Sequence, residues 1–189
     1  MSNRRAESTP ELPPGYPADL EHDLTLSDGR VVHVRPVVPS DRDELRRAIG
    51  AADPETIHAR FLGAAPPMTD ASLRHLVEVD YMHRLAVAAF APDGHGVGIA
   101  RYEGSKGSDN AEIAVVVDRE WRHNGIATDL VRTLGTAALA HGIRTFDVMT
   151  FVSNGDVQEI VIEAGLPYTR RRIGDIVEEV IQIGSERRS

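Results

Sequence analysis

The chain has 189 residues, a mass of 20.6 kDa and a formal net charge of −8 at pH 7, from 21 basic against 29 acidic residues. It contains no cysteine, which excludes a disulfide framework, a thiol nucleophile and a cysteine-ligated metal site. The acidic balance argues against general nucleic-acid binding, and no apolar run reaches the roughly 18 residues of a membrane span.

The first residues are polar and rich in proline, and they lack the apolar centre of a signal peptide. We therefore expect a cytoplasmic protein. Residues 1–19 carry too little apolar side chain to order themselves, which predicts a flexible N-terminal arm. The remaining length suits a single domain over residues 20–185, followed by a short tail at 186–189.

The first half of this domain predicts a hairpin and then helices. Turn-forming residues at 27–30 separate two short apolar stretches, 23–26 and 31–35, as in a hairpin. Ser40 and Asp43 have the spacing of a capping box for a helix to about residue 51. A second short helix is expected to begin at 53, with Ile57 and Phe61 on one face, and a third is expected after Thr69.

The second half predicts strands that alternate with helices. Apolar runs separated by turns predict strands at 85–91, 97–102, 111–117 and 145–152, and a final antiparallel pair at 168–172 and 176–183. Helical spacing predicts a long helix from Ile126, capped by Gly142, and a short helix at 157–163 that ends at Gly165. The order predicts an α/β fold with a mixed central sheet of about seven strands, flanked by helices on both faces.

One strand-to-helix junction is the most informative part of the chain. The strand at 111–117 leads into a loop with the pattern Arg-x-x-Gly-x-Ala, formed by Arg122, Gly125 and Ala127. The first turn of a helix leaves amide groups without internal partners, and these groups together with the helix dipole favour phosphate. The alternative is that Gly125 and Ala127 only permit tight packing of strand and helix. The pattern is neither a Walker A loop nor the dinucleotide-binding fingerprint.

This segment resembles motif A of the GNAT superfamily of acyl-CoA-dependent N-acyltransferases. The resemblance extends over residues 34–166. Upstream residues in matching order are similar to the GNAT domain of bacterial Pat-type protein lysine acetyltransferases. These residues are Arg35-Pro36, Pro39-Ser40-Asp41, Arg60-Phe61-Leu62, Leu76, Val79-Asp80-Tyr81 and Arg84-Leu85-Ala86-Val87.

The resemblance implies a cofactor, acetyl-CoA as acyl donor, and a set of residues that bind it. The backbone amides of the loop and first helical turn would hold the CoA pyrophosphate, the strand edge would pair with the pantetheine arm, and Asn154 would contact the cofactor. In chain order these residues are Val115, Val116, Val117, His123, Asn124, Gly125, Ile126, Ala127, Thr128 and Asn154.

Glu112 is the candidate catalytic residue, because the Pat-type pattern has a glutamate early in this strand. An amine nucleophile is mostly protonated at pH 7, since the pKa of a lysine is near 10.4, and a carboxylate can take its proton. The alternative is a solvated residue at a strand edge. The resemblance then implies direct attack of an amine, most simply that of a protein lysine, on the thioester in a ternary complex.

The sequence also departs from the family pattern. Many GNAT proteins carry a tyrosine seven residues after the asparagine, as an acid toward the leaving thiolate, and this chain has Val161 there. A thiol has a pKa of roughly 8–9, so the thiolate can leave without an enzymatic acid. His123 and Asn124 replace small or basic residues, which keeps the backbone role of the loop.

Alternatives remain for the acceptor and for the activity itself. A small amine can replace the protein lysine, and a narrow acidic pocket beside Glu112, rather than an open groove, would favour that acceptor. A non-catalytic acyl-CoA-sensing module would fit the missing tyrosine. No pair among the eight histidines has helical metal-binding spacing with a nearby acid, so we expect no metal. A homodimer through the terminal strands is an expectation from the resemblance alone.

Overall fold

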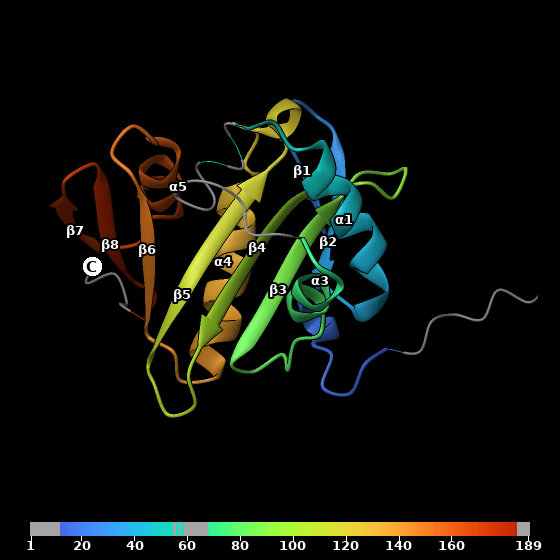
Figure 1. Ribbon diagram of the computed structural model, residues 1–189, viewed down its shortest axis with the longest axis horizontal. Helices are drawn as coiled ribbons and strands as arrows, with labels where there is room; N and C mark the ends of the chain where they lie inside the picture. The colour runs from blue at the N-terminus through green and yellow to red at the C-terminus, as the bar shows by residue number, and fades with distance from the viewer. Residues whose placement is uncertain (1–11, 55, 57, 59–67, 185–189) are drawn as a thin grey trace, which may run out of the picture.

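The computed structural model describes residues 12–54, 56, 58 and 68–184. These residues form one twisted sheet with helices on both faces, as the sequence predicts (Figure 1). The sheet has eight strands in the order β1-β2-β3-β4-β5-β6-β8-β7, one more than the expected seven or so. The strands are β1 (His22–Thr25), β2 (Val31–Pro36), β3 (Arg84–Phe90), β4 (Gly96–Gly104), β5 (Asn110–Val117), β6 (Thr145–Phe151), β7 (Tyr168–Ile173) and β8 (Ile176–Gln182).

Among the residues that the structure describes, two pairs of helices cover the sheet. The helix α4 (Ile126–Ala140) and the shorter α5 (Asp156–Ala164) lie on one face, behind the sheet in Figure 1, while α1 (Arg42–Ala51) and α3 (Asp70–Val77) cover the other. Short 3₁₀ turns are found at η1 (Ala18–Leu20), η2 (Pro39–Asp41) and η3 (Arg119–Trp121). The helices predicted at 40–51, after Thr69, from Ile126 and at 157–163 are thereby confirmed. The predicted helix from 53, with Ile57 and Phe61, lies largely outside the described residues.

The pairing of β5 is what opens the sheet. On one side β5 pairs antiparallel with β4 along its whole length, from Ala111 to Val117. On the other side it pairs in parallel with β6 through Asn110, Ala111 and Glu112 only. On its other edge, β6 pairs along its whole length with β8. Beyond Glu112, β5 and β6 therefore diverge, and the edge of β5 that faces β6 has no strand partner among the described residues.

The α4 side of the sheet contains the larger core. Alternate residues of β5, Ala111, Ile113 and Val117, point to this side and are buried against α4. The first turn of α4 comes close to β4, because Gly98 has no side chain there. A Cβ atom on Gly98 would lie 2.9 Å from Cγ2 of Ile126, which no real contact allows. Gly98 thus fixes how closely the start of α4 approaches the sheet.

The start of α1 differs from the sequence-based expectation. The predicted capping box of Ser40 and Asp43 is wrong: the N-cap residue is Asp41, and no side chain caps α1. Pro39 begins the 3₁₀ turn η2 just before α1, and Asp41 Oδ2 accepts a hydrogen bond from the amide of Val38 at 2.8 Å. Ser40, expected to cap the helix, therefore lies in the 3₁₀ turn that leads into α1.

The N-terminal part of the described chain packs against the domain. Tyr16 lies edge-on to Tyr81, with ring centroids 5.7 Å apart, so packing begins within the segment that the sequence predicts as an arm.

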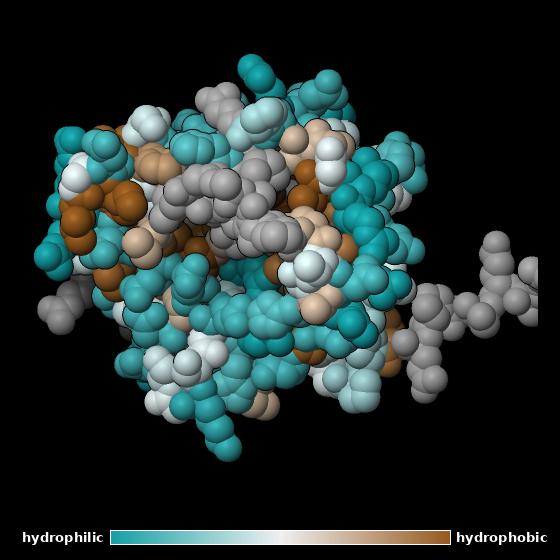
Figure 2. Space-filling view, in the orientation of Figure 1, coloured by the Kyte–Doolittle hydropathy of each residue, from teal (hydrophilic) through white to brown (hydrophobic). Residues whose placement is uncertain are grey.

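Most of the face in Figure 2 is hydrophilic, and a hydrophobic area lies over the C-terminal strands. Met149 and Ile173 in those strands are 54% and 47% exposed. The domain boundaries themselves stay a prediction.

Glu44 ties α1 to β4 and makes the stability pH-dependent. Hydrogen bonds from Arg47 and from the amide of Gly96 lower the pKa of Glu44 to about 2. A folded-state pKa below the unfolded value contributes stability above pH 4.5, and that contribution disappears as the pH falls toward 2. We expect Glu44→Gln to lower the free energy of unfolding by about 1–2 kcal/mol at pH 7, with the difference from wild type vanishing near pH 2.

Urea unfolding at a series of pH values checks this expectation. Glu120→Gln is the control, because Glu120 is exposed and its side chain makes no hydrogen bond within the described part of the chain. A difference for Glu44→Gln that is the same at pH 2 and pH 7 would show that its carboxylate charge is not the cause.

Candidate active site

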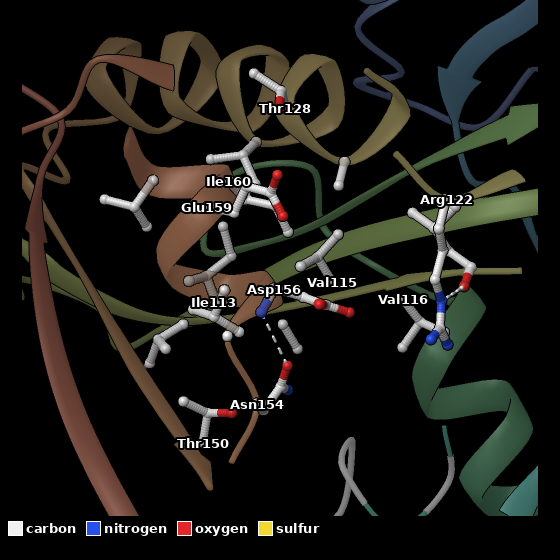
Figure 3. Close-up of a pocket in the computed structure, with 18 of the residues that line it drawn as sticks. Ile113, Val115, Val116, Arg122, Thr128, Thr150, Asn154, Asp156, Glu159 and Ile160 are labelled. Atoms are coloured by element: carbon white, nitrogen blue, oxygen red, sulfur yellow. Dashed lines mark hydrogen bonds between the residues drawn. The ribbon is translucent and has the colours of Figure 1, made fainter. Parts of the chain in front are cut away.

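A cavity of about 620 Å³ lies where β5 and β6 diverge. Its walls are the free edge of β5, the diverging part of β6, the loop that leads into α4, and the facing side of α5 (Figure 3). Every residue that the sequence singles out for catalysis or cofactor binding, apart from Asn124, lines this cavity. The structure therefore brings together side chains and amides that are far apart in the chain.

The loop before α4 presents a row of free amides. None of the six backbone N–H groups from His123 to Thr128 donates a hydrogen bond to another described residue. Two residues take left-handed backbone conformations to make this turn: His123 has φ 57° and Gly125 has φ 93°. Left-handed backbone is strained for most side chains, which explains the glycine at 125. Clustered amides at the start of a helix form a site for an anion, and phosphate suits it best.

Side chains on three sides hold this loop in place. Arg122 donates from Nε to the carbonyl oxygen of Val117 at 3.1 Å and from Nη2 to Thr56 Oγ1 at 2.6 Å. Asn124 Oδ1 accepts from Ser27 Oγ at 2.8 Å, which links the loop to the β1–β2 turn. Because the side chains of Arg122 and Asn124 are used for support, the loop offers its backbone to a ligand.

Neighbouring contacts make the support more rigid. The guanidinium of Arg30 lies 3.8 Å from the ring centroid of Trp121 and donates to the carbonyl of Glu120. At the other end, Thr128 Oγ1 donates to Glu163 Oε2 at 2.7 Å and so joins α4 to α5. The amides are therefore held in position by the fold before any ligand arrives.

The free edge of β5 runs from this loop to the bottom of the cavity. Val115 and Val116 are partly buried and Val117 is buried, and all three residues line the cavity. An extended ligand can lie along such an edge as an added strand, because unpaired backbone groups are present. The edge and the amide loop together fit a long molecule with a phosphate-bearing end.

Asn154 and Val161 lie on the α5 side of the cavity, and the side chain of His123 in the loop reaches toward α5. Asn154 lies just before α5, its Oδ1 accepts from the amide of Asp156 at 3.3 Å, and its side chain lines the cavity (Figure 3). His123 is exposed, and its Nδ1 lies 3.8 Å from Glu159 Oε2. Val161 is buried and lines the cavity without a polar group.

Glu112 stands where the two strands part. It is the last β5 residue paired with β6, opposite Asp147, and it is paired on the other side with Glu103 of β4. Residues opposite one another share a face, so three carboxylates form a row across the sheet. Glu103 accepts from Arg101 Nη2 at 2.6 Å, whereas neither Glu112 nor Asp147 is paired with a cation in the described residues. Oδ1 of Asp147 is buried without a hydrogen-bond partner among them.

A second cavity lies on the α1 and α3 side of the sheet. It has a volume of about 860 Å³, and its described lining is largely apolar. Thr56, Ala114 and Val116 line both cavities, so the two meet at β5. Glu112, Ala114 and Val116 alternate along one face of β5, which places the carboxylate of Glu112 on the same side as this second cavity.

Sequence reasoning missed three side chains of this region. Asp147 is next to Glu112 only because of the strand register, and Thr56 reaches Arg122 from the segment after α1. The sequence gives only a weak signal for Thr150, as a polar residue at an inward position of a strand.

The described residues contain no group of three or more potential metal ligands and no helix of the length and apolarity needed to cross a bilayer.

Comparison with known proteins agrees with this geometry. A family model described as the acetyltransferase (GNAT) family matches residues 59–159. A curated acetyltransferase from Pseudomonas aeruginosa is 31% identical over 144 residues, which cover 75% of this chain and 77% of that protein.

Solved structures with a similar fold include two that bear on the activity. The GNAT domain of S. lividans PAT superposes with a TM-score of 0.81 at 24% identity, covering 88% of this chain and 99% of that one. A spermidine N-acetyltransferase from Vibrio cholerae, solved with CoA and spermine, has a TM-score of 0.61 at 12% identity, covering 80% and 95%. With a family match over half of its length and a relative of this identity and coverage, the chain belongs to the GNAT acetyltransferase family and is an acyltransferase.

Proposed function

We propose that this protein transfers the acetyl group of acetyl-CoA to the side-chain amine of a protein lysine, by direct attack in a ternary complex. GNAT acetyltransferases use acetyl-CoA and an amine, so the new elements are the lysine acceptor and the residues involved. The observation that carries the proposal is the row of six free amides at one end of the cavity, joined by the open β5 edge to Glu112 at the other.

The amides from His123 to Thr128 hold the diphosphate, and the β5 edge at 115–117 binds the extended arm. Asn154 adds a polar contact from the α5 side. Acetyl-CoA supplies the electrophile, an acyl thioester. The loop residues and β5 keep that group at the divergence of the strands, and an amide of β5 that points to the thioester oxygen would stabilise developing negative charge.

Glu112 removes a proton from the incoming amine, directly or through a water molecule. At pH 7 a lysine amine is protonated in all but about one molecule in 2,500, so a base is needed at the site. The unpaired carboxylates of Glu112 and Asp147 attract the ammonium form before the proton leaves. The proton goes to the carboxylate, and the amine nitrogen attacks the acyl carbon. A C–N bond then forms, the C–S bond breaks, and coenzyme A leaves as a thiolate that takes up the second amine proton.

The shape on the acceptor side supports a protein lysine rather than a small amine. The second cavity is broad and mostly apolar in its described lining, which suits a long aliphatic side chain carried on a larger molecule. The likeness to the GNAT domain of S. lividans PAT points the same way.

The test is incubation of the purified protein with acetyl-CoA and a panel of acceptors. The panel contains lysine peptides, acyl-CoA synthetases, spermidine and an aminoglycoside, and mass spectrometry detects an added acetyl group. Acetylation of protein lysines above the rate for the small amines supports the proposal. Faster transfer to spermidine would assign a small-amine enzyme, and cofactor binding without any transfer would assign a sensing module.

A further inference from the structure

Thr150 is a buried hydroxyl without a hydrogen-bond partner. It lies on β6, is 3% exposed, and its Oγ1 makes no hydrogen bond within the described residues. The other inward positions of this part of β6 are Phe146 and Val148, which are apolar. A valine would occupy the same space without an unpaired polar atom, and an unpaired buried hydroxyl is unfavourable. Packing of the sheet therefore does not account for a threonine here.

The position of Thr150 in the cavity suggests what the hydroxyl is for. Thr150 lines the cavity, and in Figure 3 it lies at the end away from Thr128 and the start of α4. The last pair of the two diverging strands is Glu112 with Asp147, and Val115 and Thr150 are each three residues beyond it. Thr150 therefore stands on β6 at the position that corresponds to Val115 on the free edge of β5.

The cavity wall contains both polar and apolar side chains, and the polar ones include Ser153 and Asn154, which follow β6. Val157, Ile160 and Val161 of α5 line the same cavity and are apolar. An internal candidate for pairing with Thr150 is Glu179 on β8, which is the register partner of Val148 and whose Oε2 is also buried without a partner. Burial raises the pKa of Glu179, and its other oxygen, Oε1, lies 3.5 Å from Arg170 Nε. Glu179 does not line the cavity, and no hydrogen bond joins it to Thr150.

We propose that Thr150 is a cofactor-binding residue, whose hydroxyl donates a hydrogen bond to the arm of the bound acyl-CoA between the diphosphate and the acyl group. The inference rests on the proposed function, since it requires that this arm lies between β5 and β6. The chemistry fits, because the arm carries amide and thioester oxygens and a sulfur atom that accept hydrogen bonds. The bound arm supplies the partner that the packing of β6 lacks.

The test is calorimetric titration of acetyl-CoA into the wild type, Thr150→Val and Thr150→Ser, together with thermal unfolding of each protein without ligand. We expect Thr150→Val to bind acetyl-CoA about three- to tenfold more weakly, and Thr150→Ser to stay within about twofold of wild type. Without ligand, Thr150→Val is expected to have a melting temperature at or above that of wild type, because it loses an unpaired buried hydroxyl. Adenosine 3′,5′-bisphosphate, which lacks the arm, is expected to bind wild type and Thr150→Val equally.

Each contrary result has a distinct meaning. If Thr150→Val binds acetyl-CoA as tightly as wild type, Thr150 does not contact the cofactor and the inference fails while the proposed function stands. A melting temperature clearly below wild type with unchanged affinity would assign Thr150 to internal packing, with Glu179 as its partner. Equal weakening for acetyl-CoA and the bisphosphate would also overturn the inference, because the effect would then come from the loop. Absence of acetyl-CoA binding by the wild type would instead overturn the proposed function.

Discussion

Glu112→Gln is expected to lower kcat for a lysine acceptor by about 10²–10⁴-fold at pH 7, with little change in the affinity for acetyl-CoA. Glutamine has a similar size and stays on the same strand, but it cannot take a proton from the amine. The Glu112 side chain lies on the face of β5 away from α4, so its loss leaves the amide loop unchanged. Steady-state kinetics and calorimetry on the same preparations separate the two effects.

The pH profile distinguishes a lost base from a damaged site. Without a base, the variant depends on amine that is already deprotonated, so its rate should rise about tenfold per pH unit until the pH nears the amine pKa of about 10.4. Glu103→Gln is the control, because Glu103 is adjacent in register and already paired with Arg101. Retention of the wild-type rate by Glu112→Gln would show that another group takes the proton, and weaker acetyl-CoA binding would assign Glu112 a structural role.

The sequence predicted the amide loop well because its cause is local. A β-branched strand, a glycine with left-handed backbone and an apolar helical stripe are all read from adjacent residues, and Gly125 and α4 are found as expected. The open edge of β5 was assigned only through the resemblance. It depends on where β5 and β6 stop pairing, beyond Glu112 and Asp147, and the point at which two strands diverge leaves no signal in either strand alone.

Side-chain partners were the least predictable part of the site. The sequence does not indicate that Asn124 binds Ser27 or that Arg122 reaches Thr56, since both contacts join segments that only the fold brings together. The same holds for the register that sets Asp147 beside Glu112. Thr150 could have been noticed from the alternation of β6, but the sequence alone does not tell a cavity wall from a packed core.

His123→Asp is expected to weaken acetyl-CoA binding by about ten- to a hundredfold, while His123→Asn stays within about threefold of wild type. His123 is exposed with φ 57°, a backbone conformation that asparagine and aspartate tolerate better than most residues, so both variants should fold. They are nearly identical in shape and differ by one negative charge. That charge lies in the loop whose amides are proposed to hold the diphosphate, and it repels a phosphate anion.

The salt dependence of binding separates charge repulsion from a distortion of the loop. Repulsion between exposed charges is screened as the Debye length falls from about 10 Å at 0.1 M salt to about 3 Å at 1 M, so the gap between the two variants should narrow in high salt. Isothermal titration of acetyl-CoA at both salt concentrations measures it. A gap that is unchanged by salt would point to a distorted loop, and equal binding by both variants at low salt would mean that the diphosphate does not lie at the start of α4.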